Sequence, residues 1–241
     1  MNGTVVILGA GVSQGIGGAL ARKFAAEGHH VVVTGRTLEK VESVADEIKT
    51  AGHSAEAMQV DVTQEKDQDA LFEHVAKLGP LSAVLFNAGN NAVIPFAELT
   101  SETYEQFWRI GSYGAFLTAK RAIPLLEEQG EGSLFFTGAS ASLRGRPNFA
   151  HFAAMKAGLR MLAQALARDY GPKGVHVVHA IIDGVVNSER TRSRYGEYMD
   201  SLGENGVLSP DAVADSYWHI HNQPKSAWTH EIEMRPFSEK W

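Results

Sequence analysis

Residues 4–18 read TVVILGAGVSQGIGG, and this stretch decides the fold. Thr4 to Leu8 form a continuous apolar, β-branched run, which is typical of a strand buried on both faces. A glycine-rich turn follows, and apolar residues then recur at helical spacing from Ile16 onward. Glycine lets a backbone approach a pyrophosphate closely, and a helix N-terminus offers free N–H groups and the positive end of its dipole. The stretch therefore predicts a nucleotide-binding strand-turn-helix unit.

The alternation of strand and helix continues along the chain and predicts parallel strands joined by right-handed crossovers. Pattern alone locates helices near 37–50, 64–77, 101–128 and 149–170, and strands near 4–8, 30–34, 55–60, 81–86, 133–137 and 175–182. We expect an α/β single-domain Rossmann fold over residues 1–241: a doubly wound parallel sheet of about seven strands with helices on both faces. The polar segment 188–209 is expected to be irregular. It would form either a lid at the substrate side or plain surface, as a solvated loop or an amphipathic helix.

Composition narrows the class of protein. The chain has 241 residues, 22 basic against 28 acidic, and a net charge of −6, which argues against nucleic-acid and anionic-membrane partners. The lack of cysteine excludes disulfides and fits a reducing compartment. No run approaches the roughly 20 apolar residues of a membrane span. The ten histidines lack partners at ligand spacing, so no metal site is predicted. We expect a soluble, cytoplasmic protein that acts on a small molecule.

Three motifs carry a resemblance to a known family. Gly11, Gly15 and Gly17 have the spacing G-x-x-x-G-x-G, and Asn-Ala-Gly at 87–89 ends the fourth predicted strand. Lys156, followed by Ala-Gly-Leu, lies in a long predicted helix. With these motifs the chain resembles the short-chain dehydrogenase/reductase family over nearly its whole length. Ala10 departs from the pattern, because the family usually has a threonine there that ties down the glycine turn.

The resemblance implies a nicotinamide dinucleotide, and the residues suggest which one. An acidic residue at the end of the second strand would select NAD, but this strand ends in Thr34-Gly35-Arg36-Thr37. Arg36 can bind a 2′-phosphate, with Ser13 or Thr37 as a supporting donor, so NADP(H) is preferred and NAD(H) is the alternative. The resemblance implies that Asp61 and Val62 contact the adenine and that Ser188 contacts the carboxamide of the nicotinamide. In full, it places cofactor contacts at Gly11, Ser13, Gln14, Gly15, Ile16, Gly17, Arg36, Asp61, Val62, Asn87, Ala88, Gly89, Lys156, Gly184, Val186 and Ser188.

The catalytic positions implied by the resemblance are mostly changed. The family's tyrosine, four residues before the lysine, is Phe152; its serine is Ala139, and its helix asparagine is Gly111. Lys156 alone remains. Phenylalanine has no proton to exchange, and loss of a general acid costs about 10²–10⁴ in rate. Beside Lys156 we take Ser140 and Tyr113 as the catalytic candidates, with the other polar groups open to the same role being Ser142, His151 and Asp183.

Two functions follow from this pattern. The first is NADP(H)-dependent hydride transfer to or from a small carbonyl or alcohol, with a non-standard proton donor. The alternative is a catalytically impaired NADP(H)-binding sensor or scaffold. A dehalogenase-like offshoot without cofactor is disfavoured, since the phosphate turn and Lys156 are both present. The resemblance also implies a homodimer or homotetramer formed through the helices near 101–128 and 149–170.

Overall fold

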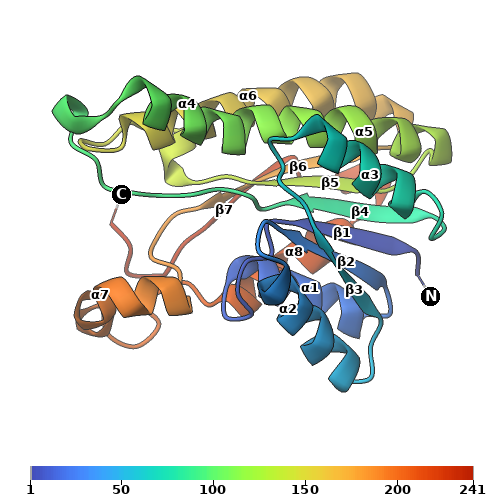
Figure 1. The fold of residues 1–241 in the computed structure, drawn as a ribbon, viewed down its shortest axis with the longest axis horizontal. Coiled ribbons are helices and arrows are strands. Elements are labelled where there is room, and N and C mark those ends of the chain that lie inside the picture. The colour runs from blue at the N-terminus through green and yellow to red at the C-terminus, as the bar shows by residue number, and fades with distance from the viewer. Residues whose placement is uncertain (1, 241) are drawn as a thin grey trace.

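Seven parallel strands form the central layer of the protein (Figure 1). The computed structural model describes residues 2–240, and the strands follow the order β3-β2-β1-β4-β5-β6-β7. The order reverses between β1 and β4, which creates the crevice where ligands of such sheets bind. The predicted α/β doubly wound fold is therefore confirmed. The strands are β1 (Thr4–Leu8), β2 (His30–Gly35), β3 (Ala55–Gln59), β4 (Leu81–Phe86), β5 (Ser133–Thr137), β6 (His176–Ile182) and β7 (Glu231–Met234).

Helices cover both faces of the sheet because successive strand residues point to opposite sides. Val5 and Ile7 enter one hydrophobic cluster, whereas Val6 and Leu8 enter the other. The first cluster is covered by α1 (Ile16–Ala26), α2 (Leu38–Thr50) and α8 (Pro210–His221), and the second by α3 (Glu65–Val75), α5 (Gly114–Gln129) and α6 (Ala150–Tyr170). Figure 1 shows these two layers below and above the sheet.

The helix predicted over 101–128 is divided by a wider turn. It comprises α4 (Ser101–Trp108), a π-helical turn at Arg109–Tyr113, and α5. Such turns accommodate an extra residue and frequently occur at functional sites. Gly111 lies in this turn and is buried against α6.

The segment after β6 is more regular than its polar sequence indicated. Of the two surface alternatives, loop and helix, the structure shows a helix: α7 (Glu189–Ser201), with a kink at Tyr195. In Figure 1 α7 lies apart from the two helical layers. The helix α8 and the strand β7 follow it, and pattern located neither, because Glu-Ile-Glu-Met in β7 is short and charged. Within residues 2–240, no helix combines the length and apolar character needed to cross a membrane, and no group of His, Asp or Glu is arranged to hold a metal ion.

Candidate functional site

The glycine turn lies between β1 and α1, and two of its glycines pack too closely against backbone to admit a side chain. Gly9 has a φ of 83°, and a Cβ there would lie 2.6 Å from the Cα of Ala88. A Cβ on Gly17 would lie 2.5 Å from the Cα of Ala10, so α1 approaches the turn directly. Gly11 has a φ of 66° but faces open space, with no atom within 4 Å of a built Cβ. The turn thus leaves room beside the free N–H groups at the start of α1, which fits a pyrophosphate.

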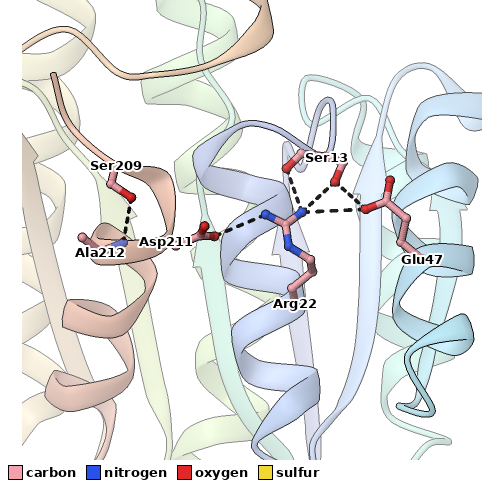
Figure 2. Close-up of polar contacts among 6 residues, drawn as sticks. All are labelled: Ser13, Arg22, Glu47, Ser209, Asp211 and Ala212. Carbon is pink, nitrogen blue, oxygen red and sulfur yellow. Dashed lines mark hydrogen bonds and ion pairs between the residues drawn. The ribbon is translucent and has the colours of Figure 1, made fainter.

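A different residue ties down this turn in place of the threonine that Ala10 replaces. Arg22, on α1, donates from Nη1 to the Ser13 carbonyl oxygen (2.9 Å) and to Ser13 Oγ (2.6 Å). Its Nη2 pairs with Asp211 of α8 at 3.3 Å. Ser13 Oγ in turn donates to Glu47 of α2 at 2.5 Å. Figure 2 shows Arg22 at the centre of this network, which links the turn to three helices.

Sequence reasoning missed Arg22 because an arginine on a helix gives no local signal of what it faces. A second link comes from a residue that was predicted. Asn87 donates from Nδ2 to the carbonyl oxygen of Gly9 at 2.9 Å, joining the end of β4 to the turn. The glycine turn and the Asn-Ala-Gly motif, both predicted from the sequence, therefore lie together at the switch point of the sheet.

The residues predicted for the adenosine end lie at the carboxyl ends of β2 and β3. Arg36 is exposed, and no residue in 2–240 hydrogen-bonds or ion-pairs with its guanidinium. Asp61 Oδ1 accepts hydrogen bonds from the amide (2.9 Å) and hydroxyl (2.8 Å) of Thr63, which fixes its carboxylate. Val62 is buried against α5, where it contacts Gly114. Gln14 is exposed at the top of the turn.

Lys156 lies at the base of the crevice, on α6. Its side chain is buried, and its Nζ donates to the Thr137 carbonyl oxygen at the end of β5, 2.6 Å away. A Cβ on Gly89 would lie 3.6 Å from this Nζ, so Lys156 reaches the Asn-Ala-Gly segment. Burial lowers the pKa of Lys156 from 10.5 to about 8, because desolvation disfavours the ammonium form.

The three changed catalytic positions offer no polar side chain. The Phe152 ring centroid lies 5.8 Å from Lys156 Nζ, so the ring occupies the neighbouring position on the helix face. Ala139 is 9% exposed and offers no hydroxyl. A Cβ on Gly111 would lie 2.2 Å from Met155 Sδ. The buried Met155 side chain would therefore have to move to admit a larger residue at Gly111.

The candidate proton donors differ in the groups that their side chains contact. Tyr113 donates its hydroxyl to Glu65 at 3.2 Å and stacks with Trp108, so it is directed toward α3. Ser142 donates to the carbonyl oxygen of Ala139 at 2.7 Å. His151 packs edge-on against a buried phenylalanine, and burial lowers its pKa. Ser140 instead makes its hydrogen bond with Asp183, the residue at the end of β6.

Asp183 is 1% exposed and forms a charged cluster that sequence reasoning did not foresee. Arg144 Nη2 lies 3.1 and 3.0 Å from its two carboxylate oxygens, and Arg235 Nη2 lies 3.4 Å from Oδ2. Burial alone would raise the pKa of Asp183. The Ser140 hydrogen bond and the two guanidinium groups outweigh burial, so the pKa lies below its usual value and the group is a carboxylate near neutral pH.

The residues predicted for the nicotinamide end follow Asp183 directly. Gly184 has a φ of 147°, and a Cβ there would lie 2.6 Å from Pro236. Val186 forms a parallel bridge with Leu208, on the far side of α7. Ser188 caps α7, because its Oγ accepts from the amide of Thr191 at 3.2 Å.

The helix α7 contacts the residue that directly follows the Asn-Ala-Gly motif. Arg190 Nη2 donates to Asn90 Oδ1 at 2.6 Å, although the two residues are 100 positions apart. The helix therefore contacts the edge of the crevice next to Gly89. Its role as a lid remains a prediction.

Comparison with known proteins shows the family to which the chain belongs. A model of the short chain dehydrogenase family matches residues 4–198, which is most of the chain. The chain belongs to the short-chain dehydrogenase family. A solved short-chain dehydrogenase from Rhodopseudomonas palustris is 37% identical to this family member, with a TM-score of 0.85 over 98% of this chain and 100% of that one.

Two further relatives agree with this assignment. The oxidoreductase asL5 of Sarocladium schorii is 31% identical over 195 residues, covering 80% of this short-chain dehydrogenase and 76% of that protein. A metagenomic short-chain oxidoreductase, solved in complex with NADP, is 23% identical, with a TM-score of 0.82 over 98% and 97% of the two chains. The second likeness concerns the fold alone. Together with the family match, the first supports an oxidoreductase of this family.

Proposed function

We propose that the protein is an NADP(H)-dependent oxidoreductase that interconverts a small carbonyl compound and its alcohol with a non-standard proton donor. The observation that carries this proposal is Lys156: a buried amine fixed to the Thr137 carbonyl oxygen and in contact with the Asn-Ala-Gly segment. A buried, uncompensated lysine is costly, and such groups cluster at functional sites. Its Nζ lies between Thr137 at the end of β5 and Gly89 after β4, at the edge of the sheet where a dinucleotide binds in this architecture.

The residues around the crevice fit the dinucleotide. The glycine turn would hold the pyrophosphate, Asp61 the adenine, and Lys156 the nicotinamide ribose. Arg36 supports the phosphorylated form, because its guanidinium is free of partners within residues 2–240 and no carboxylate ends β2. The relative solved with NADP has the same fold. When bound, the nicotinamide would supply or accept the hydride.

The chain's own groups would position the substrate and deliver the proton. The Phe152 ring excludes water beside Lys156, since it packs near the ammonium without offering a hydroxyl. Ser140 follows Ala139 directly, and its hydroxyl hydrogen-bonds Asp183. To protonate the reacting oxygen this hydroxyl would turn from Asp183 to that oxygen and then recover a proton from solvent. We propose Ser140 as the group that contacts the reacting oxygen. A serine hydroxyl is a weak acid, so turnover should be slow for this family, by about 10²–10⁴.

The second candidate is an NADP(H)-binding sensor or scaffold without turnover. It is favoured by the packing of Met155 into the space beside Gly111 and by the Phe152 ring, because these two side chains fill positions where the family keeps proton-transferring groups. Both candidates require cofactor binding, and only the first requires hydride transfer. One experiment can therefore separate them.

The test is a fluorescence titration with NADPH and with NADH, followed by single-turnover absorbance measurements with a panel of aldehydes and ketones. NADPH should bind at least 10-fold more tightly than NADH. Arg36→Ala should remove this preference, whereas Lys40→Ala, which removes an exposed cation from α2, should retain it. Equal loss for both cofactors in Arg36→Ala would reject the NADP(H) assignment. Binding without oxidation of bound NADPH by any carbonyl would favour the sensor or scaffold.

We also propose that the chain self-associates through α4, α5 and α6 into a dimer or tetramer. Large apolar side chains are exposed on all three helices, including Trp108 on α4, Phe116 on α5 and Met161 on α6. Exposed apolar patches of this kind mark contact surfaces. Light scattering with size-exclusion chromatography measures the state, and Phe116→Glu should shift it toward the monomer. A cytoplasmic location remains a proposal based on the lack of cysteine.

A further inference from the structure

A charged cluster lies at the carboxyl ends of the strands, and the proposed hydride step gives no role to its arginines. The cluster consists of Ser140, Arg144, Asp183, Glu233 and Arg235, and we call it the Asp183 cluster. Its members come from the segment after β5, the end of β6, and the end of β7. Each member of the cluster therefore lies at or near the carboxyl end of a strand, the edge of the sheet where ligands bind in this architecture.

Asp183 is held too firmly to be a surface charge. Its side chain is 2% exposed, and an isolated buried carboxylate is strongly unfavourable. The Ser140 hydroxyl, Arg144 and Arg235 all interact with it, while Arg235 also contacts Glu233. Such a carboxylate fixes the side chains around it and stays ionised, so we assign it no part in proton donation. Asp183 is a positioning residue.

Arg144 is partly exposed and keeps free hydrogen-bond donors. Its side chain is 32% exposed, and only its Nη2 is engaged by residues in 2–240, by the two oxygens of Asp183. The N–H donors on Nε and Nη1 have no partner in that part of the chain. A guanidinium that is anchored at one nitrogen keeps its plane fixed while its other donors remain free for a ligand.

The location of Arg144 relative to the reacting centre follows from short chain connections. Thr137 holds Lys156, and three residues later Ser140 contacts the same carboxylate as Arg144. Gly184, a predicted nicotinamide contact, directly follows Asp183. Through Asp183, Arg144 is therefore linked both to Ser140, which would contact the reacting oxygen, and to the adjoining Gly184.

We propose that Arg144 binds a carboxylate of the substrate, so that the protein acts on carbonyl or alcohol compounds that carry an acid group. This inference rests on the proposed function and narrows its substrate class. An arginine-carboxylate contact is charge-assisted and orients its ligand strongly. A neutral substrate would leave the Arg144 donors desolvated and unpaired, which disfavours it.

The test compares acids with esters of the same shape. 4-Carboxybenzaldehyde and a series of 2-oxo and 3-oxo acids are titrated by calorimetry against the wild-type protein, with and without NADP⁺, alongside their methyl esters. At least one acid should bind at least 10-fold more tightly than its ester. Arg144→Ala should abolish that preference. Arg146→Ala, an exposed arginine of the same loop that makes no ion pair within residues 2–240, should preserve it.

The outcomes of this test are distinct from failure of the proposed function. Acids that bind no better than esters, no binding by any acid, or a preference that survives in Arg144→Ala would each overturn the inference. Arg144→Ala removes one of the two cations that pair with the Asp183 carboxylate, which can destabilise the fold. The Arg144→Gln/Asp183→Asn double variant removes both charges of that pair and serves as the comparison. It should also lose the preference for acids over esters. Failure of the proposed function would appear separately, as acid binding without NADP(H) binding or hydride transfer.

Discussion

Arg22→Ala is the change that most directly tests how this protein holds its phosphate turn. The substitution removes the two hydrogen bonds that Arg22 makes to the backbone oxygen and the hydroxyl of Ser13, and it removes the ion pair with Asp211. Ala10 provides no hydroxyl to compensate. The remaining side-chain links would be the Ser13 hydroxyl bond to Glu47 and the Asn87 bond to Gly9, on the other side of the turn. We expect the residues between these two links to become mobile.

The expected magnitude follows from these contacts. A hydrogen bond from a charged donor contributes about 1.5–3 kcal/mol when shielded, but the Arg22 side chain is 36% exposed, so screening reduces it. We expect a loss of about 1 kcal/mol in the free energy of unfolding. Cofactor binding must then restore order to the turn, which costs about 1–2 kcal/mol per residue fixed. Part of this ordering free energy is subtracted from the free energy of binding, so NADPH affinity should be about 10-fold weaker.

The chain provides a matched control on the same helix. Lys23 pairs with Asp215 of α8 at 3.0 Å and with Glu27 at 2.9 Å, so Lys23→Ala also removes an ion pair between α1 and α8 without reaching the turn. NADPH affinity is measured by fluorescence titration, and hydrogen exchange reports the mobility of the amides in residues 11–15. Arg22→Ala should weaken binding and speed exchange there, and Arg22→Lys should give an intermediate result. If Arg22→Ala and Lys23→Ala weakened NADPH equally, the positioning role would be rejected.

Three further predictions concern the surroundings of Lys156. Phe152→Tyr places a hydroxyl beside the lysine and should raise single-turnover reduction of a carbonyl panel by about 10²-fold; an unchanged rate would show that Phe152 does not limit turnover. Gly111→Asn should destabilise the protein by about 1–3 kcal/mol in urea unfolding, because its Cβ would lie 2.2 Å from Met155 Sδ, and adding Met155→Ala should recover much of the loss; a neutral Gly111→Asn would contradict this packing. The pKa of Lys156 is about 8 in the folded protein against 10.5 when unperturbed. Between about pH 8 and pH 10.5 the unfolded chain therefore binds a proton at Lys156 that the folded protein does not bind. The contribution of Lys156 to the free energy of unfolding consequently rises with pH across that range. Cofactor-free Lys156→Met should therefore be more stable than the wild-type protein at pH 7, and the difference should shrink as the pH approaches 10.5; a constant difference would show that Lys156 does not titrate in this range.

The order of the strands and the position of the crevice could be predicted because their signals are local. The apolar run at 4–8, the glycine turn and the Asn-Ala-Gly segment each lie within one short stretch, and regular alternation of elements restricts the sheet to few topologies. The four-residue spacing of Phe152 and Lys156 likewise predicts that their side chains share one helix face, and the ring and ammonium are neighbours in the structure. β7 was missed because four residues with two glutamates resemble a loop.

The sequence by itself determined the family's architecture, the phosphate turn, and the loss of the tyrosine hydroxyl at Phe152. Only the tertiary structure decided that Arg22 holds Ser13, that Met155 fills the space beside Gly111, and that Asp183 anchors Arg144. The physical reason is sequence separation: Asp183 and Arg144 are 39 residues apart, and no periodicity or spacing within one element specifies which side chains meet when two such elements pack. Local patterns set which faces are buried, whereas the pairing of charges across the crevice depends on the finished fold.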